Sequence, residues 1–273
     1  MGVAAAVLGV ALALATPSAG SVAFLQARQA PGGGFAERGG APNAALTAWA
    51  ALALKAAGAS ADASARAYLV AHEDQLETAS DLALGILGET AAGADAGRLV
   101  ARLKALERPS GTIGPLLNGT IWSVIALRAV GEPVPPVTVR YLVARQSAGG
   151  GWSWSKGGAP DSNDTAAAIE ALRSVGVKGP VVTRALQFLR RFQRRDGGFA
   201  LLRGRSSDTQ STAWAIQAYF AAGAQPPRSA FRYLARLRRA DGSYRYSAAS
   251  AATPVWVTAQ VLPALVGKPF PLR

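Results

Sequence analysis

The sequence contains no cysteine and a single histidine, His72. Without cysteine the chain forms no disulfide, has no catalytic thiolate and offers no thiolate ligand to a metal. With one histidine, a Ser-His-Asp triad has a single candidate for its histidine, and a metal site with several histidine ligands is excluded. His72 stands beside Glu73 and Asp74, and we interpret this group as a solvated helix end rather than a metal site. No metal or cofactor is predicted.

Charged residues are scarce and mostly of one sign. They make up 16% of the 273 residues against 50% hydrophobic residues, which indicates a folded, core-forming protein with length for one large domain. The net charge is +13. The arginines are spread along the whole chain, so we interpret them as solvated outer faces that also suit an anionic envelope surface, and nucleic acid is not predicted as a partner.

Long hydrophobic runs are missing except at the start of the chain. Residues 3–15 form an apolar run that is too short to span a bilayer but has the length of a signal-peptide core. Sites of the signal-peptidase type end at Ala15 and Ala23. We therefore predict that residues 1–23 are a signal peptide or an N-terminal apolar segment, with a buried first helix as the alternative. The mature chain is expected to be secreted or associated with the cell envelope, without a stable membrane span.

Two repeated features organise the rest of the chain. The first is a glutamine followed by a glycine-rich turn that an aromatic residue closes, at residues 29–35, 146–152 and 193–199, with weaker copies at 238–244 and 107–113. Glycine permits the positive φ and close backbone approach of such a turn. We expect the aromatic to fill the space between neighbouring units and the glutamine to hydrogen-bond an adjacent helix end. The predicted role of the turn is structural.

The second feature is a helix that ends in glycine, and it defines six units. The terminal glycines are Gly58, Gly93, Gly131, Gly176, Gly223 and Gly267. Each unit combines an amphipathic helix, such as that around residues 188–192, with a helix that is apolar nearly all round, such as residues 212–222. Six pairs of an outer and an inner helix either stack as an open solenoid or close into a ring.

The repeated turn resembles the one shared by squalene and terpene cyclases and the β-subunits of protein prenyltransferases. That resemblance implies an all-α fold, an (α/α)6 toroid, over residues 24–267, followed by a short tail at 268–273. The inner helices of such a toroid are parallel, so their N-termini and polar first turns meet at one mouth of a central cavity.

Alignment of the inner helices on their terminal glycines brings polar and aromatic residues into register. Helix N-capping explains most of the Asp and Asn residues, and packing between helices is the alternative for the tryptophans. Trp154 is expected to overhang the mouth. Glu170 interrupts an apolar helix, either as a buried salt bridge to an arginine or as a polar anchor. The residues predicted to bind a ligand are Asp161, Asn163, Asp164, Asp208, Gln210, Glu170, Gln217, Trp154, Trp49, Trp122 and Trp214.

The fourth unit begins with a string that resembles the Asp-x-Asp-Asp-Thr-Ala motif of class II terpene cyclases. It is Asp161-Ser162-Asn163-Asp164-Thr165-Ala166. In that family the middle aspartate protonates an alkene or an epoxide, whereas an amide, as at Asn163, has no such proton. The position of Asp164 orients in the family and does not donate. A cavity between two domains, expected for class II cyclases, and an aromatic content of only 7% also count against cyclisation.

Other branches of the resemblance differ in what they require. Prenyltransferases and complement thioester proteins need a cysteine, which the chain lacks. Residues 208–217 are similar to the toroid domain of cobalamin carriers. The sequence therefore favours an exported, non-catalytic toroid that binds a corrinoid or another large amphipathic or hydrophobic small molecule, with an envelope protein as a further partner. The alternatives are a terpenoid cyclase-like enzyme whose acid is Asp164, Asp161 or Glu170, and a structural scaffold.

Overall fold

The computed structural model describes residues 16–272, and the backbone over this range is helical without a named strand. Each of six outer helices precedes an inner helix in the chain. The outer helices are α1 (Thr16–Gln26), α3 (Ala63–Ala71), α5 (Gly97–Lys104), α7 (Pro136–Ala144), α9 (Pro180–Arg190) and α11 (Arg228–Leu237). The inner helices are α2 (Ala44–Ala56), α4 (Ala79–Ala92), α6 (Leu117–Ala129), α8 (Ser162–Ser174), α10 (Thr209–Ala221) and α12 (Pro254–Leu265), and a short 3-10 helix, η1 (Glu73–Gln75), follows α3.

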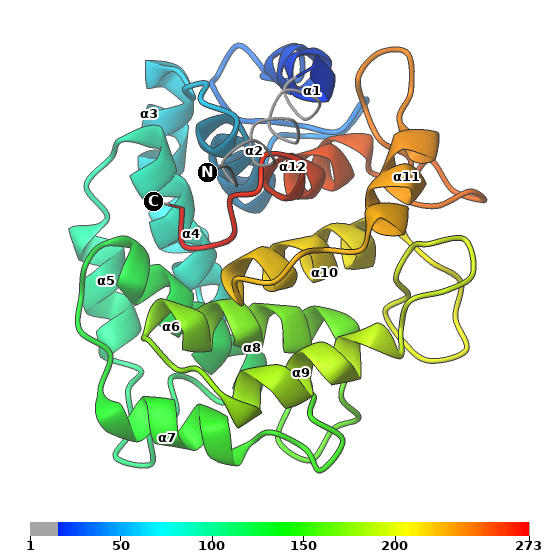
Figure 1. Ribbon diagram of the computed structural model, residues 1–273. Helices are drawn as coiled ribbons and strands as arrows, with labels where there is room; N and C mark the ends of the chain where they lie inside the picture. Colours follow the sequence, from blue (N-terminus) through cyan, green and yellow to red (C-terminus); the bar gives the residue numbers. More distant parts are fainter. Residues whose placement is uncertain (1–15, 273) are drawn as a thin grey trace, which may run out of the picture.

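The inner helices form a closed ring. Each packs against the next in chain order, and α12 packs back against α2 (Figure 1). The outer helices surround this ring, and their buried residues join the same core as those of the inner helices. The inner helices are buried on both sides because they are apolar nearly all round, as in α2, where only Lys55 is charged. The predicted all-α (α/α)6 toroid of six helix pairs is confirmed.

A repeated threonine fastens each glycine-rich turn to its inner helix. Thr165 Oγ1 accepts the backbone N–H of Trp152 at 3.0 Å and donates to Asp161 O at 2.6 Å. The same threonine-to-turn bond recurs in the pairs Thr47 with Phe35, Thr120 with Ile113, Thr212 with Phe199 and Thr258 with Tyr244. The residue that closes each of these turns is at most 1% exposed. The repeated sequence therefore reflects one hydrogen-bonded contact between turn and inner helix that recurs in five repeats.

The glutamine of the turn links one repeat to the next. Gln146 Nε2 donates to Gly150 O at 2.9 Å and to Val181 O at 2.8 Å, at the start of the following outer helix. Gln193 and Gln29 bridge in the same way to Ser229 and Ser64. The predicted structural role of the turn is confirmed.

Gly150 supports a prediction about stability. Its φ is +98°, and a Cβ there would lie 2.6 Å from Arg184 O, whereas Gly157, with φ +81°, has open space around it. We expect Gly150→Ala to lower the free energy of unfolding by about 3 kcal/mol, because backbone strain and a backbone clash add. Gly157→Ala is the matched control and carries the strain alone, about 1–2 kcal/mol. Urea unfolding of both variants measures the difference, and equal losses would contradict the clash.

The first outer helix crosses the boundary predicted at residue 24. Helix α1 begins at Thr16, and Phe24 and Leu25 belong to the core. The apolar run at 3–15 lies outside the described residues, so export stays a prediction. A cut after Ala15 leaves α1 whole, whereas a cut after Ala23 removes Ser21, whose hydroxyl donates to Gly242 O at 2.7 Å. Within residues 16–272 no helix has both the length and the apolarity to cross a bilayer.

Additional hydrogen bonds join the two ends of the repeat array, where α12 packs against α2. The Glu37 carboxylate, in the loop before α2, accepts the backbone N–H groups of Val255 at 3.1 Å and Trp256 at 2.9 Å. These are first-turn donors of α12 that no residue within the helix can satisfy. A loop early in the chain thus caps the last inner helix.

Candidate functional site

A pocket of about 300 Å³ opens where the N-terminal ends of α6, α8 and α10 meet. It lies at the mouth that the parallel inner helices predict, and we name it the mouth pocket. Eight of the predicted ligand-binding residues line it, namely Trp49, Trp122, Trp154, Asp161, Asn163, Asp164, Gln210 and Trp214. Asn118, Leu201 and Gln260 complete its wall.

Three tryptophans form the floor of the mouth pocket. The ring centroids of Trp49, Trp122 and Trp214 lie 5.3 to 6.0 Å apart, and all three pairs meet edge to face. They come from three different inner helices and meet near the axis of the ring. The rings pack against one another at the centre of the toroid, as the helix-packing alternative predicts, and they also line the cavity above it. Their binding of a ligand stays a prediction.

Asp164 is held in the wall by its neighbours on two inner helices. Its backbone N–H donates to Asp161 Oδ1 at 2.8 Å, so Asp161 caps α8. Asn118 Nδ2 on α6 donates to Asp164 Oδ1 at 2.5 Å, and Asn118 Oδ1 accepts from Ser80 Oγ at 3.0 Å. Asp164 is only 5% exposed. A chain of three polar side chains from α4, α6 and α8 therefore fixes the carboxyl group.

The environment of Asp164 keeps this carboxyl group protonated. Burial is the main cause, and the charge and hydrogen bond of Asp161 act in the same direction, so that the pKa of Asp164 rises to about 8. The hydrogen bond from Asn118 opposes this shift by stabilising the carboxylate. Burial and the neighbouring Asp161 thus favour the protonated form of Asp164, on the wall of a pocket whose floor is aromatic.

Gln260 on α12 ties the floor to the rim. Its Oε1 accepts from Trp214 Nε1 at 2.7 Å and from Gln210 Nε2 at 3.0 Å. Its Nε2 is buried and has no hydrogen-bond partner among the described residues. These bonds fix the orientation of the Trp214 indole, which is 3% exposed.

Three of the eleven predicted ligand-binding residues lie outside the mouth pocket, and two of them, Asp208 and Gln217, act as structural groups. Asp208 caps α10 by accepting the N–H of Ser211 at 2.7 Å and its hydroxyl at 2.8 Å. Gln217 is fully buried, and its Nε2 donates to Gln260 O at 3.5 Å. Asn43 caps α2 through Leu46 N at 2.8 Å. The predicted N-capping is confirmed for Asn43, Asp161 and Asp208.

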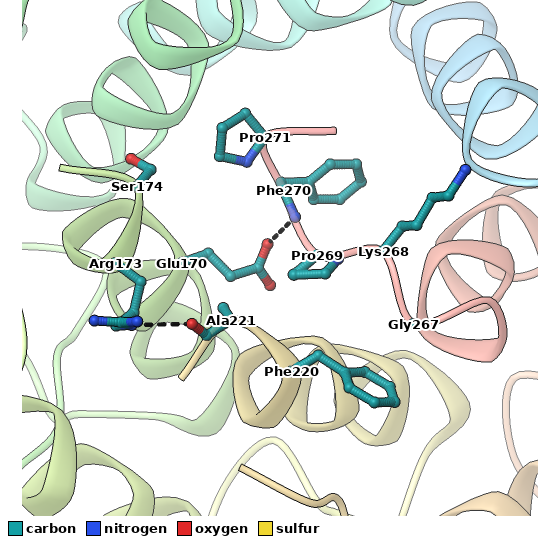
Figure 2. Close-up of a pocket in the computed structure, with 10 residues that line it drawn as sticks. All are labelled: Glu170, Arg173, Ser174, Phe220, Ala221, Gly267, Lys268, Pro269, Phe270 and Pro271. Carbon is teal, nitrogen blue, oxygen red and sulfur yellow. Dashed lines mark hydrogen bonds between the residues drawn. The ribbon is translucent and has the colours of Figure 1, made fainter. Parts of the chain in front are cut away.

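Of the two roles predicted for Glu170, the salt bridge to an arginine is absent from the described residues, whereas a buried polar anchor with a raised pKa is found in the wall of a second pocket. Glu170 does not line the mouth pocket. Its Oε2 accepts the backbone N–H of Phe270 at 2.7 Å, at the opposite end of the ring (Figure 2). Complete burial raises the pKa of Glu170 well above its ordinary value. The carboxyl group of Glu170 holds the C-terminal segment. This segment belongs to no repeat, so the sequence pattern did not predict the contact.

Three wall residues had no assigned role in the sequence-based prediction. Asn118 stands thirteen residues before its terminal glycine, in register with Asn163 and Gln210, so the alignment contained a signal for it. Gln260 and Thr258 are the two polar residues of α12, which is otherwise apolar. Leu201 comes from the loop before α10 and carries no such mark.

The group around His72 is a structural helix end. The imidazole stacks on Tyr68 with centroids 3.9 Å apart, and its Nδ1 is 2.7 Å from Tyr68 O. The buried Glu73 carboxyl faces Arg98 at 3.5 Å. Across residues 16–272 no three His, Asp or Glu side chains gather as metal ligands do.

Comparison with solved structures places the chain in the same fold as a terpene cyclase. Type II terpene cyclase MstE from Scytonema, in complex with its substrate geranylgeranyl dihydroxybenzoate, matches 93% of this chain over 96% of its own, at 18% identity and a TM-score of 0.67. A protein from Actinoplanes matches 93% of this chain and 99% of its own, at 19% identity and TM-score 0.71. A glycosidase in complex with glucose matches 92% and 95%, at 13% identity and TM-score 0.64. No protein-family model and no curated protein sequence matches the chain.

The cyclase comparison corrects one expectation from the sequence. A cavity between two helical domains was expected of class II cyclases, yet 96% of the solved cyclase chain is matched by this single toroid. The low aromatic content also carries less weight, because four of the six tryptophans line the mouth pocket. The presence of a glycosidase with the same fold means that the fold alone does not select the chemistry.

Proposed function

We propose that this protein is a terpenoid cyclase-like enzyme that acts on an isoprenoid held in the mouth pocket. The observation that carries the proposal is the neutral carboxyl group of Asp164 beside an apolar, tryptophan-floored cavity. The likeness to the Scytonema terpene cyclase over almost the full length of both chains supports the same activity. This function is the alternative that the sequence motif at 161–166 implied.

The proposed reaction begins with proton transfer from Asp164. The O–H bond of its carboxyl group breaks, and the proton adds to a carbon of a substrate double bond or to an epoxide oxygen. The next double bond attacks the cation and closes a ring. A later cation loses a proton to water, so that the product of an alkene substrate is an isomer of that substrate. Asp164 regains its proton from solvent through the partly exposed Asp161.

The neighbours of Asp164 have separate tasks in this scheme. The Asn118 amide donates to the carboxylate that proton loss leaves behind. The rings of Trp49, Trp122 and Trp214 exclude water, and a ring face turned toward the cation stabilises it by about 0.5–2 kcal/mol. Asn163, which occupies the motif position of the family's acid, lines the pocket as an amide.

The volume of the mouth pocket restricts the substrate. At about 30 Å³ for each water-sized group, about 300 Å³ holds on the order of ten such groups. We therefore propose a short isoprenoid or the reactive end of a longer one. A corrinoid is a far larger macrocycle, and for this reason the carrier interpretation has less support. An envelope partner and export stay predictions.

Product analysis tests the proposed function. The protein is incubated with geraniol, farnesol and their terminal epoxides, and products are identified by gas chromatography and mass spectrometry. We expect a cyclic isomer of at least one alcohol or epoxide. In D2O the product of an alkene substrate is expected to carry one added deuterium, because the initiating proton comes from an exchangeable acid. The absence of cyclic products together with a lack of binding to all four compounds would overturn the proposal.

A further inference from the structure

The C-terminal segment enters the ring from the end opposite the mouth. After α12 ends, residues 268–272 turn inward between the C-terminal ends of the inner helices (Figures 1 and 2). This segment borders a second space of about 380 Å³, whose other walls are the ends of α8 and α10. The sequence analysis assigned these residues to a short tail without a role, and the structure buries Phe270 at its centre.

Phe270 reaches the underside of the tryptophan floor. Its ring centroid lies 6.1 Å from that of Trp49 and 6.0 Å from that of Trp214, and the side chain is 2% exposed. Trp49 and Trp214 also line the mouth pocket. The tryptophans and Phe270 together form the partition between the mouth pocket and the space at the other end of the ring.

A buried carboxyl group holds Phe270 in place. Glu170 Oε2 accepts its backbone N–H at 2.7 Å, and Glu170 is the one charged-type residue in the buried middle of α8. Its other oxygen, Oε1, has no hydrogen-bond partner within residues 16–272. Burial of a polar group costs free energy unless the group is hydrogen-bonded. The hydrogen bond from the Phe270 N–H therefore offsets part of the cost of burying the Glu170 carboxyl group.

We propose that this segment is an internal plug in which Phe270 determines specificity, because it sets the depth of the mouth pocket and with it the longest isoprenoid that the pocket accepts. Glu170 is the positioning residue that holds the plug. The inference rests on the proposed function. It explains why a toroid with space at both ends has a mouth pocket of only about 300 Å³.

Shortening Phe270 removes the support beneath two indoles. The rings of Trp49 and Trp214 then gain room to tilt toward the second space, and the mouth pocket deepens. An apolar cavity of this kind takes up an apolar ligand more readily than water. A longer isoprenoid buries an additional unit in the deepened pocket, which favours it over a shorter one.

Chain-length preference tests the plug. Dissociation constants for geraniol, farnesol and geranylgeraniol, three alcohols of increasing length, are measured by tryptophan fluorescence. We expect Phe270→Ala and the milder Phe270→Leu to shift the ratio of dissociation constants toward geranylgeraniol by at least about tenfold. Phe220→Leu is the matched control, since Phe220 borders the same space but contacts Phe231 on an outer helix. Its preference should equal that of the parent protein.

Two further variants separate positioning from packing. Glu170→Ala should shift the preference in the same direction as Phe270→Leu. Glu170→Gln should keep the parent preference, because the amide carbonyl still accepts the Phe270 N–H. A measurement without ligand accompanies them, in which acrylamide quenching of tryptophan fluorescence is expected to increase for Phe270→Leu but not for Phe220→Leu.

The outcomes distinguish the plug from the activity. If the parent protein binds none of the alcohols, the proposed function is contradicted, and quenching alone decides whether Phe270 seals the floor. If the alcohols bind but Phe270→Leu changes neither their order nor the quenching, the plug is wrong while the proposed function stands. Far-UV circular dichroism verifies that each variant is folded.

Discussion

Replacement of Asp164 by asparagine is expected to lower the rate of isoprenoid cyclisation by about 10²–10⁴-fold, the range that a general acid contributes. The amide has the same shape and still accepts the hydrogen bond from Asn118, but it has no acidic proton. The rate constant is measured by product formation at saturating substrate. Binding of the substrate should change by less than about tenfold, because the carboxyl group is already neutral when substrate binds.

A second buried acid provides the matched control for this experiment. Glu89 on α4 is 1% exposed and has a pKa raised to about 7, mainly by burial and the nearby Glu73, but it lies away from the mouth pocket. Glu89→Gln should therefore leave the rate within about twofold of the parent value. An Asp164→Asn protein with full activity would show that another group supplies the proton, and an equal loss in Glu89→Gln would point to a general effect on the fold.

The melting temperature is expected to fall by at least about 10 °C between pH 5 and pH 8. Asp164 and Glu89 have folded-state pKa values of about 8 and about 7, and the pKa of the buried Glu170 is raised as well. Above their ordinary pKa values the unfolded chain loses these protons while the folded chain keeps them. The folded state then binds more protons, so the free energy of unfolding decreases by up to about 1.4 kcal/mol per pH unit for each group.

Single variants assign this dependence. Well below the ordinary pKa values of 3.8 for Asp and 4.5 for Glu both states are protonated, so the contribution is constant there. Asp164→Asn, Glu89→Gln and Glu170→Gln should each flatten the decrease between pH 5 and pH 8. Asp241→Asn is the control, because hydrogen bonds from Ser243 lower the pKa of Asp241 and its contribution changes only in acid. A melting temperature that is level from pH 5 to pH 8 in the parent protein would contradict these pKa shifts.

Local sequence signals were sufficient to predict six pairs of helices, because the terminal glycines, the glycine-aromatic turns and the Asp or Asn caps act within one or two repeats. They left an open solenoid and a closed ring as alternatives, and the resemblance to the cyclase repeat predicted the ring. The hydrogen bond from the N–H of Trp152 to Thr165 Oγ1 shows how a spacing that is repeated along the chain produces the same contact between turn and helix. Because these contacts are local, they were visible without any knowledge of the ring.

The sequence identified the residues of the mouth pocket that occupy equivalent positions on parallel helices. It did not identify contacts between residues on opposite sides of the ring. Alignment on the terminal glycines located Asp161 and the three floor tryptophans, whereas Asp164 was identified from the resemblance of residues 161–166 to the cyclase motif. The raised pKa of Asp164 depends mainly on burial within the assembled ring, which no spacing reveals. The contact of Phe270 with Glu170 spans 100 residues and belongs to no repeat, so the sequence contained no signal for the position of the tail.

The bond of Glu37 to the start of α12 has a consequence for how the molecule comes apart. An open array of repeats loses structure from its terminal units, because each end has only one neighbour. Here the first and last units are each other's neighbours, so there is no terminus at which fraying starts. Thermal melting is expected to be all-or-none, and Glu37→Ala, which removes the cap of α12, should lower the melting temperature while α12 still packs against α2.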